Sequence, residues 1–113
     1  MTPLSKKEMG NSFGLKEDDL QNIIDILQQQ PEVEEALIFG SRAKGNYRAG
    51  SDVDMAIKGD GINLKIITHI SYLLNEETVM PYQFDVLNYH SIRNLELVEH
   101  IDRAGISFYK KQY

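Results

Sequence analysis

Residues 37–57 read LIFGSRAKGNYRAGSDVDMAI: an apolar run, a glycine-rich connection and an alternating segment. The apolar run belongs to a strand predicted over Val33–Phe39, which enters a hydrophobic core. The alternating segment predicts a second strand over Asp52–Ile57, which follows a turn-like stretch. These two short strands lie close together in the sequence, and the other segments are interpreted relative to them.

Gly40-Ser41 joins the first strand to a short helix expected through Arg42–Lys44. Ser41 could cap this helix. Backbone N–H groups at such a start are unpaired and favour a phosphate, and the missing side chain of Gly40 permits close approach. The corner is therefore a candidate phosphate site, although an ordinary N-cap would use the same serine.

The second strand places two carboxylates on one face. Side chains alternate along a strand, so Asp52 and Asp54 point to one side, about 7 Å apart. Val53, Met55 and Ile57 point to the other side, and their burial would fix the register. Two like charges this close favour a bound dication, and carboxylate oxygens suit Mg²⁺ or Mn²⁺. Taken alone, the Asp-x-Asp pattern also fits an exposed turn, where carboxylates are common.

A third carboxylate lies in a strand predicted over Gln83–Leu87. Phe84 and Val86 share one face of this strand, whereas Asp85 lies on the opposite face. An aspartate within an apolar strand is costly unless it is paired or bound to a cation. If this strand lies beside the Asp52–Ile57 strand, three carboxylates converge in an arrangement that suits two-metal chemistry.

The remaining segments alternate between helical and extended patterns. A polar lead-in is expected over residues 1–14, followed by a single domain over residues 15–113. The further predicted elements are a helix over Lys16–Gln30 ended by Pro31, a helix carrying an apolar stripe from Ile62 to Leu74, a helix from an N-cap at Ser91 to a stop at Gly105, and a strand over Ile106–Tyr109.

Composition narrows the class of protein. The chain has 113 residues, enough for one domain with one core, and a net charge of −5. The acidic balance argues against general nucleic-acid binding, although Arg42, Lys44 and Arg48 could together favour a small anion. The sequence contains no cysteine, no apolar stretch long enough to cross a membrane and no signal-peptide pattern, so a cytoplasmic location is expected.

The combined pattern resembles the signature of the DNA polymerase β-like nucleotidyltransferase superfamily, and in particular its minimal nucleotidyltransferase (MNT) group. The matching residues are Gly40-Ser41, then after ten residues Asp52-Val53-Asp54, and Asp85 in a later strand. The resemblance extends over about Leu15–Tyr109. It implies an α/β (α+β) fold in which helices and strands alternate around a small mixed β-sheet.

The resemblance also implies a role for each matched carboxylate. Asp52 and Asp54 are expected to bind two metal ions, Mg²⁺ or Mn²⁺. Asp85 is expected to bind the catalytic metal and to accept the proton of the attacking hydroxyl group.

For the nucleotide, the resemblance implies that Gly40 and Ser41 hold the β- and γ-phosphates of ATP. Two basic residues, Arg42 and Lys44, are expected near the triphosphate. Reaction at the α-phosphate would release pyrophosphate and transfer AMP.

The MNT group is similar to the antitoxin half of bacterial and archaeal toxin–antitoxin pairs whose toxin is a HEPN-domain ribonuclease. The resemblance implies transfer of AMP to a tyrosine of that toxin. Two alternatives stay open: a binding module that neutralises a toxin by covering it, and a small-molecule nucleotidyltransferase. Labelling of a partner by ATP, and loss of that labelling when Asp52 and Asp54 are both replaced, would separate AMP transfer from neutralisation by binding alone.

Overall fold

The computed structural model describes residues 13–48 and 50–112. In chain order, their elements are α2 (Glu17–Gln28), β1 (Glu35–Phe39), α3 (Ser41–Lys44), β2 (Val53–Lys58), α4 (Leu64–Glu76), β3 (Phe84–Asn88), the 3₁₀ helix η1 (Tyr89–Ser91), α5 (Leu95–Ala104) and β4 (Ile106–Lys110). Each predicted helix and strand is present, with ends shifted by a few residues. None of the described helices is long and apolar enough to cross a membrane.

The four strands form one mixed sheet in the order β3-β2-β1-β4. β1 pairs antiparallel with both β2 and β4, whereas β2 pairs parallel with β3. Parallel neighbours need a crossover connection, and α4 supplies it between β2 and β3. This crossover brings the two strands that carry the predicted carboxylates side by side.

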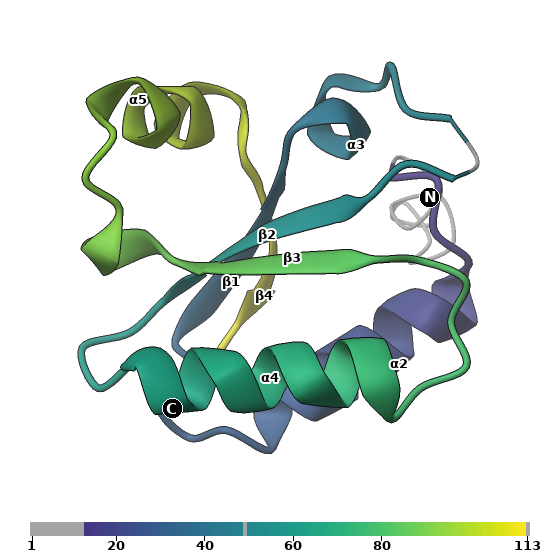
Figure 1. The fold of residues 1–113 in the computed structure, drawn as a ribbon, viewed down its shortest axis with the longest axis horizontal. Helices are drawn as coiled ribbons and strands as arrows, with labels where there is room; N and C mark the ends of the chain where they lie inside the picture. The colour runs from purple at the N-terminus through teal and green to yellow at the C-terminus, as the bar shows by residue number, and fades with distance from the viewer. Residues whose placement is uncertain (1–12, 49, 113) are drawn as a thin grey trace, which may run out of the picture.

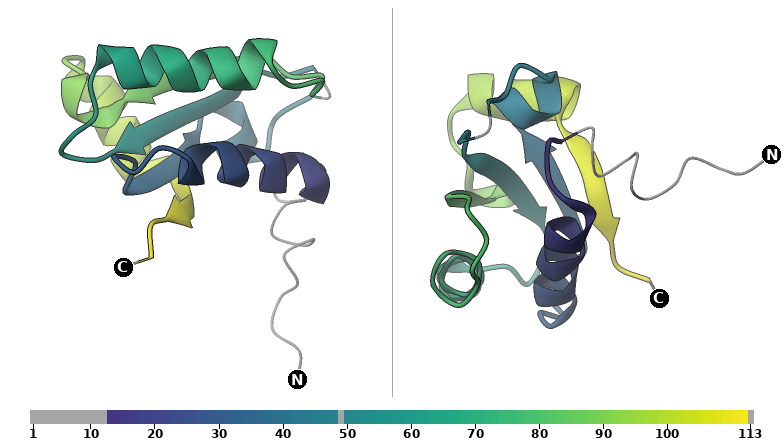
Figure 2. Two further views of the ribbon diagram at one scale, coloured as in Figure 1. Left: turned by 90° about the horizontal axis from the view of Figure 1, so that it is seen from below. Right: turned by 90° about the vertical axis from the view of Figure 1, so that its right-hand side faces the viewer.

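One face of the sheet, here called the packed face, is covered by α2 and α4, which run side by side below the sheet in Figure 1 and again in Figure 2. Val53, Met55 and Ile57 point to this face and are fully buried. Ile70 and Leu74 of α4 belong to the same apolar cluster. Burying each such side chain stabilises the fold by about 1.5–3 kcal/mol, so the packed face fixes the register of β2.

The opposite face, here called the carboxylate face, carries α5 and the smaller of the two apolar clusters. Phe39, Ala56 and Ile101 are the buried members of that cluster. Figure 1 shows α5 and α3 above the sheet, on the side away from α2 and α4. Because neighbouring residues of a strand point to opposite faces, the alternation that buries Met55 turns Asp54 toward this side.

Asparagine side chains, and not serines, cap two of the helices. Asn63 caps α4 and Asn94 caps α5, each by accepting hydrogen bonds from N–H groups of the first turn. The predicted cap at Ser91 is wrong, because Ser91 lies in η1, which ends before α5 begins. The suggested cap at Ser41 is also wrong, because Gly40 occupies the N-cap position and Ser41 is the first helical residue.

Most of the predicted lead-in, residues 1–14, lies outside the described residues. Phe13 is described and is buried in the core together with Leu15. Its ring meets that of Phe108 edge-on, with centroids 6.5 Å apart. The packed part of the described chain therefore includes Phe13, two residues before the predicted start of the domain.

Candidate active site

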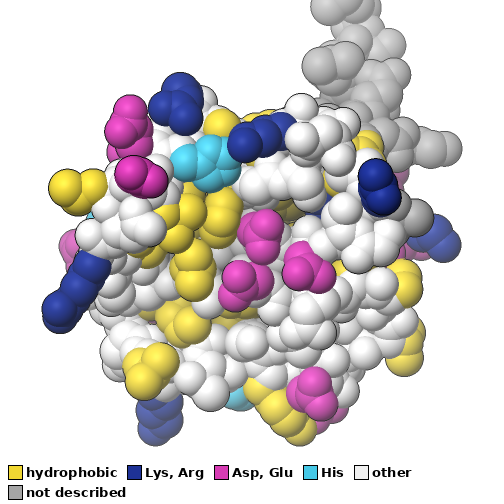
Figure 3. Space-filling view, turned by 45° about the horizontal axis from the view of Figure 1, so that its top comes forward, with side chains coloured by type: hydrophobic (Ala, Val, Ile, Leu, Met, Phe, Trp, Pro, Cys, Tyr) yellow, Lys and Arg dark blue, Asp and Glu magenta, His cyan; other side chains and the backbone are white. Residues whose placement is uncertain are grey.

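The three predicted carboxylates come together at one end of the β2–β3 pair. Asp54 and Asp85 are direct neighbours in the parallel register, and Asp52 immediately precedes β2. Asp52 and Asp85 are exposed, whereas Asp54 is half-buried. Figure 3 shows acidic side chains gathered near the middle of this face, with a histidine and a basic side chain close by. The strand pairing on which the predicted convergence depended is therefore present.

This arrangement disfavours ionisation of Asp54. Burial raises the pKa of the Asp54 carboxyl, and the carboxylates of Asp85 and Asp52 raise that pKa further. Desolvation and like charges both disfavour the ionised form. A cation bound between these side chains would offset both effects.

The oxygen donors suit Mg²⁺ or Mn²⁺, but they do not form a ready-made cage. Within residues 13–48 and 50–112, no three histidine, aspartate or glutamate side chains are arranged to hold a metal ion. Magnesium commonly takes one or two protein carboxylates and completes its octahedral shell with water and substrate phosphates. The donor set therefore fits a metal that binds together with a nucleotide better than it fits a permanent structural metal.

Gly40 brings the chain into direct contact with Asp54. Its φ of 74° and ψ of −150° lie in a region that is essentially restricted to glycine. A Cβ atom built at Gly40 would collide with Oδ2 of Asp54. Phe39, the preceding residue, pairs with Asp54 in the β1–β2 register. The corner predicted to hold phosphates therefore lies directly beside the central carboxylate.

Arg42 is enclosed within the protein. Its side chain is 1% exposed, and its guanidinium donates to the Phe13 carbonyl at 2.8 Å and to the Ser51 carbonyl at 2.9 and 3.3 Å. The rings of Tyr47 and Tyr82 have their centroids 5.3 and 5.1 Å from its Cζ. These contacts tie α3 to the segment just before the carboxylates. They argue against the predicted contact between Arg42 and a triphosphate.

Ser41 and Lys44 lie at the two ends of α3. Ser41 is half-buried, whereas Lys44 is exposed. Gly45 follows with a left-handed φ of 85°, and its N–H donates to the Ser41 carbonyl at 3.0 Å. Both side chains remain near the Gly40 corner along the chain, so their contacts with a nucleotide stay predictions.

Two residues far apart in sequence support the site without any sequence signal. Asn75 of α4 accepts a hydrogen bond from the Phe84 N–H at 2.8 Å and donates to the Phe84 carbonyl at 3.0 Å. This pair fixes the residue that precedes Asp85. His100 of α5 accepts a hydrogen bond through Nε2 from the Gly40 N–H at 3.4 Å. Both contacts depend on tertiary structure, so residue spacing could not reveal them.

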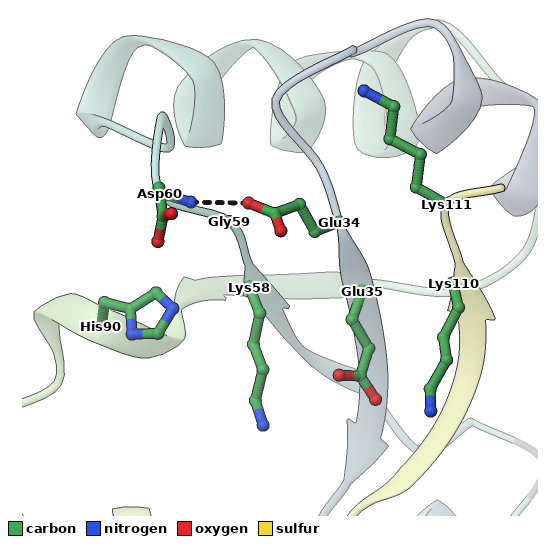
Figure 4. A pocket seen from close by; sticks show the side chains of 8 residues that line it. All are labelled: Glu34, Glu35, Lys58, Gly59, Asp60, His90, Lys110 and Lys111. Carbon is green, nitrogen blue, oxygen red and sulfur yellow. Dashed lines mark hydrogen bonds between the residues drawn. The ribbon is translucent and has the colours of Figure 1, made fainter. Parts of the chain in front are cut away.

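A hollow lies at the other end of β2 from Asp54 (Figure 4). Lys58 and Lys110 line it beside the acidic Glu35. Glu34 accepts a hydrogen bond from the Asp60 N–H at 3.0 Å at its edge. None of the predicted site residues lines this hollow, and its mixed charges do not select a triphosphate. The candidate active site is therefore the Gly40-Ser41 corner together with the carboxylates beside it.

Comparison with known proteins adds evidence that is independent of this geometry. The sequence model of the family described as polymerase beta, nucleotidyltransferase, matches residues 21–113. A Methanocaldococcus jannaschii protein with the provisional name protein adenylyltransferase MJ0435 is 37% identical over 76 residues. The aligned part spans 66% of this chain and 78% of that protein.

Several solved structures share the fold. A crystal structure of a toxin–antitoxin with AMP-PNP matches with a TM-score of 0.68 and 19% identity, covering 82% of this chain and 74% of that one. The toxin–antitoxin MntA-HepT matches with a TM-score of 0.63 and 16% identity over 86% and 74%. A provisionally named nucleotidyltransferase of Sulfolobus solfataricus gives 0.54 and 20% over 98% and 93%. The predicted α/β fold with a small mixed sheet is confirmed.

Proposed function

The chain belongs to the polymerase β nucleotidyltransferase family, and on that premise we propose that it transfers AMP from ATP to a hydroxyl group of a partner protein. The observation that carries the proposal is the meeting of Asp54 and Asp85 in adjacent strands, directly beside Gly40. A backbone corner without a side chain can approach phosphates, and neighbouring carboxylates can hold the cation that accompanies them.

In this proposal Asp52, Asp54 and Asp85 hold Mg²⁺ or Mn²⁺ together with the phosphates. When bound there, such a metal would neutralise phosphate charge and favour ionisation of the attacking hydroxyl. A bond forms between the acceptor oxygen and the α-phosphorus, the bond from that phosphorus to the bridging oxygen breaks, and pyrophosphate leaves. Asp85, which is exposed at the rim, accepts the hydroxyl proton.

Gly40 and Ser41 are proposed to hold the β- and γ-phosphates through backbone N–H groups and the serine hydroxyl. The positive φ of Gly40 keeps this backbone against Asp54. Lys44 is exposed on α3 and can add positive charge. Arg42 contributes by holding the corner in place through its bonds to two backbone carbonyls.

The acceptor is proposed to be a tyrosine of a HEPN-domain toxin, with this chain acting as the antitoxin. The name of the M. jannaschii relative supports a protein acceptor for the AMP group. The structural neighbours include toxin–antitoxin complexes, one of them solved with AMP-PNP. Asp52 and Asp85 are exposed, so a protein side chain can approach the carboxylates.

The test is transfer of labelled AMP to the protein encoded by the neighbouring gene. The two proteins are co-expressed and purified together, then treated with Mg²⁺ and labelled ATP, and the partner is examined by intact mass and peptide mapping. We expect a gain of one or more AMP units on a tyrosine. Labelled GTP in parallel measures the base preference.

The matched variants are Asp52→Asn with Asp54→Asn, and Asp60→Asn as the control at the other end of β2. The double variant should lose labelling while remaining folded, and the control should label normally. Equal labelling by the double variant would overturn the assignment of these carboxylates. If the double variant fails to label yet still neutralises the partner fully, neutralisation comes from binding and the catalytic antitoxin function is wrong.

A further inference from the structure

His100 lies against the Gly40 corner, although sixty residues separate the two in sequence. Its Nε2 accepts a hydrogen bond from the Gly40 N–H at 3.4 Å. Its ring meets the ring of Phe39 edge-on, with centroids 6.2 Å apart. The side chain is half-buried, so the imidazole packs against the protein on one side and keeps contact with solvent.

α5 fixes the position of His100 through the two residues that follow it. Ile101 is 1% exposed and belongs to the apolar cluster on the carboxylate face. The side chain of Asp102 accepts a hydrogen bond from the Tyr89 hydroxyl at 2.5 Å. Packing and hydrogen bonding therefore hold this part of α5 on the sheet. The imidazole stays directed at Gly40 even if the bond between Gly40 and His100 is weak.

The hydrogen bond itself is long, because backbone N–H donors usually lie about 2.9–3.0 Å from their acceptors. A long bond between uncharged groups is easily exchanged for a shorter one to a charged acceptor, which is roughly twice as strong. A phosphate oxygen is such an acceptor. Once it accepts from the Gly40 N–H, it lies next to His100 Nε2, which donates to it in the tautomer that carries its proton on Nε2.

We infer that His100 is a phosphate-binding residue of the nucleotide site. In the free protein its Nε2 takes the place of a phosphate oxygen on the Gly40 N–H. When a nucleoside triphosphate binds, the same nitrogen donates to the β- or γ-phosphate. The inference rests on the proposed function, since it requires that Gly40 faces the triphosphate. It extends the site from the β1–β2 segment to α5 and adds a side-chain donor where Arg42 supplies none.

The test compares the affinity of the full-length chain for a non-hydrolysable ATP analogue with Mg²⁺ and for AMP, both by isothermal titration calorimetry. His100→Phe keeps an aromatic ring against Phe39 and removes both ring nitrogens. We expect it to weaken binding of the triphosphate analogue about ten- to a hundredfold, as for loss of a hydrogen bond to a charged group. Binding of AMP should change less than about twofold on the same scale, because AMP lacks the β- and γ-phosphates.

Two further variants distinguish phosphate binding from a structural role. His100→Gln keeps a polar donor and acceptor and should retain most of the affinity. His69→Phe, on the exposed side of α4, should leave both ligands unaffected. Unchanged triphosphate affinity in His100→Phe would overturn the inference, as would equal losses for triphosphate and AMP, or a loss in folded His100→Gln as large as in His100→Phe. If the wild-type chain fails to bind the analogue, the proposed function itself is wrong.

Discussion

The packed face and the carboxylate face are built from alternate residues of the same strands, but their burial has opposite consequences. On the packed face, Met55 is fully buried among apolar side chains. On the carboxylate face, its neighbour Asp54 is half-buried beside two other carboxylates, and its pKa is raised. The difference teaches that burial on one face of β2 stabilises the strand sufficiently for the other face to carry carboxylates that oppose folding.

The largest change in stability should come from the packed face. Met55→Ala leaves a cavity in the core and should lower the free energy of unfolding by about 3 kcal/mol. Met55→Leu, which keeps the volume, should cost less than about 1.5 kcal/mol. Urea unfolding measures both. A cost below about 1 kcal/mol for the alanine variant would show that the packed face does not hold β2 in place.

A smaller loss of stability should follow from replacing Arg42, the enclosed arginine that binds the carbonyls of Phe13 and Ser51. Arg42→Lys keeps the charge but loses the fork that reaches both the Phe13 and Ser51 carbonyls, so we expect a cost of about 2 kcal/mol. Arg48→Lys, at an exposed position between α3 and β2, should change the free energy of unfolding by less than about 0.5 kcal/mol. Denaturant titration compares the two variants, and equal effects would contradict the structural role of Arg42.

The smallest effect concerns the pH dependence of stability. Because the pKa of Asp54 is raised on folding, the unfolded chain loses this proton first. The free energy of unfolding should therefore fall as pH rises from about 4, the ordinary value for aspartate, through the raised pKa. Asp54→Asn removes this loss, so its stability relative to wild type should be greater at pH 7 than at pH 4.

The control for this comparison is Asp60→Asn, since Asp60 is exposed and distant from the carboxylates. Urea unfolding of the three proteins at several pH values provides the measurement. A stability advantage of Asp54→Asn that shrinks as the pH rises would have the wrong sign and would contradict the raised pKa. Adding Mg²⁺ with ATP should stabilise the wild type more than Asp54→Asn.

Local sequence patterns predicted the elements and the division of faces. Alternation in β2 separated Asp54 from Met55 correctly, because a period of two is a property of the strand itself. The meeting of Asp54 with Asp85 depended on the order of strands in the sheet, and the sequence could state it only as a condition. The resemblance to a known family supplied the mixed fold that satisfies this condition.

Apart from the two local caps predicted at Ser41 and Ser91, the errors and omissions concern contacts that cross the fold. Arg42 follows the Gly40-Ser41 corner in sequence, so a position near phosphates was expected, yet the partners that enclose it lie elsewhere in the chain. Asn75 and His100 act through hydrogen bonds with residues 9 and 60 positions away. The sequence of a helix does not indicate which distant residue a polar side chain will bind. These partners become visible only when α4 and α5 are packed on the sheet.

The most direct test of the account measures metal binding at the carboxylate face by electron paramagnetic resonance of Mn²⁺. Wild type, Asp54→Asn and Asp60→Asn are titrated with Mn²⁺ in the presence and absence of a non-hydrolysable ATP analogue. We predict that the analogue greatly strengthens Mn²⁺ binding to wild type and to Asp60→Asn, and that Asp54→Asn loses this gain. Equal Mn²⁺ binding by all three proteins with the analogue present would contradict the claim that these carboxylates hold a metal–nucleotide complex.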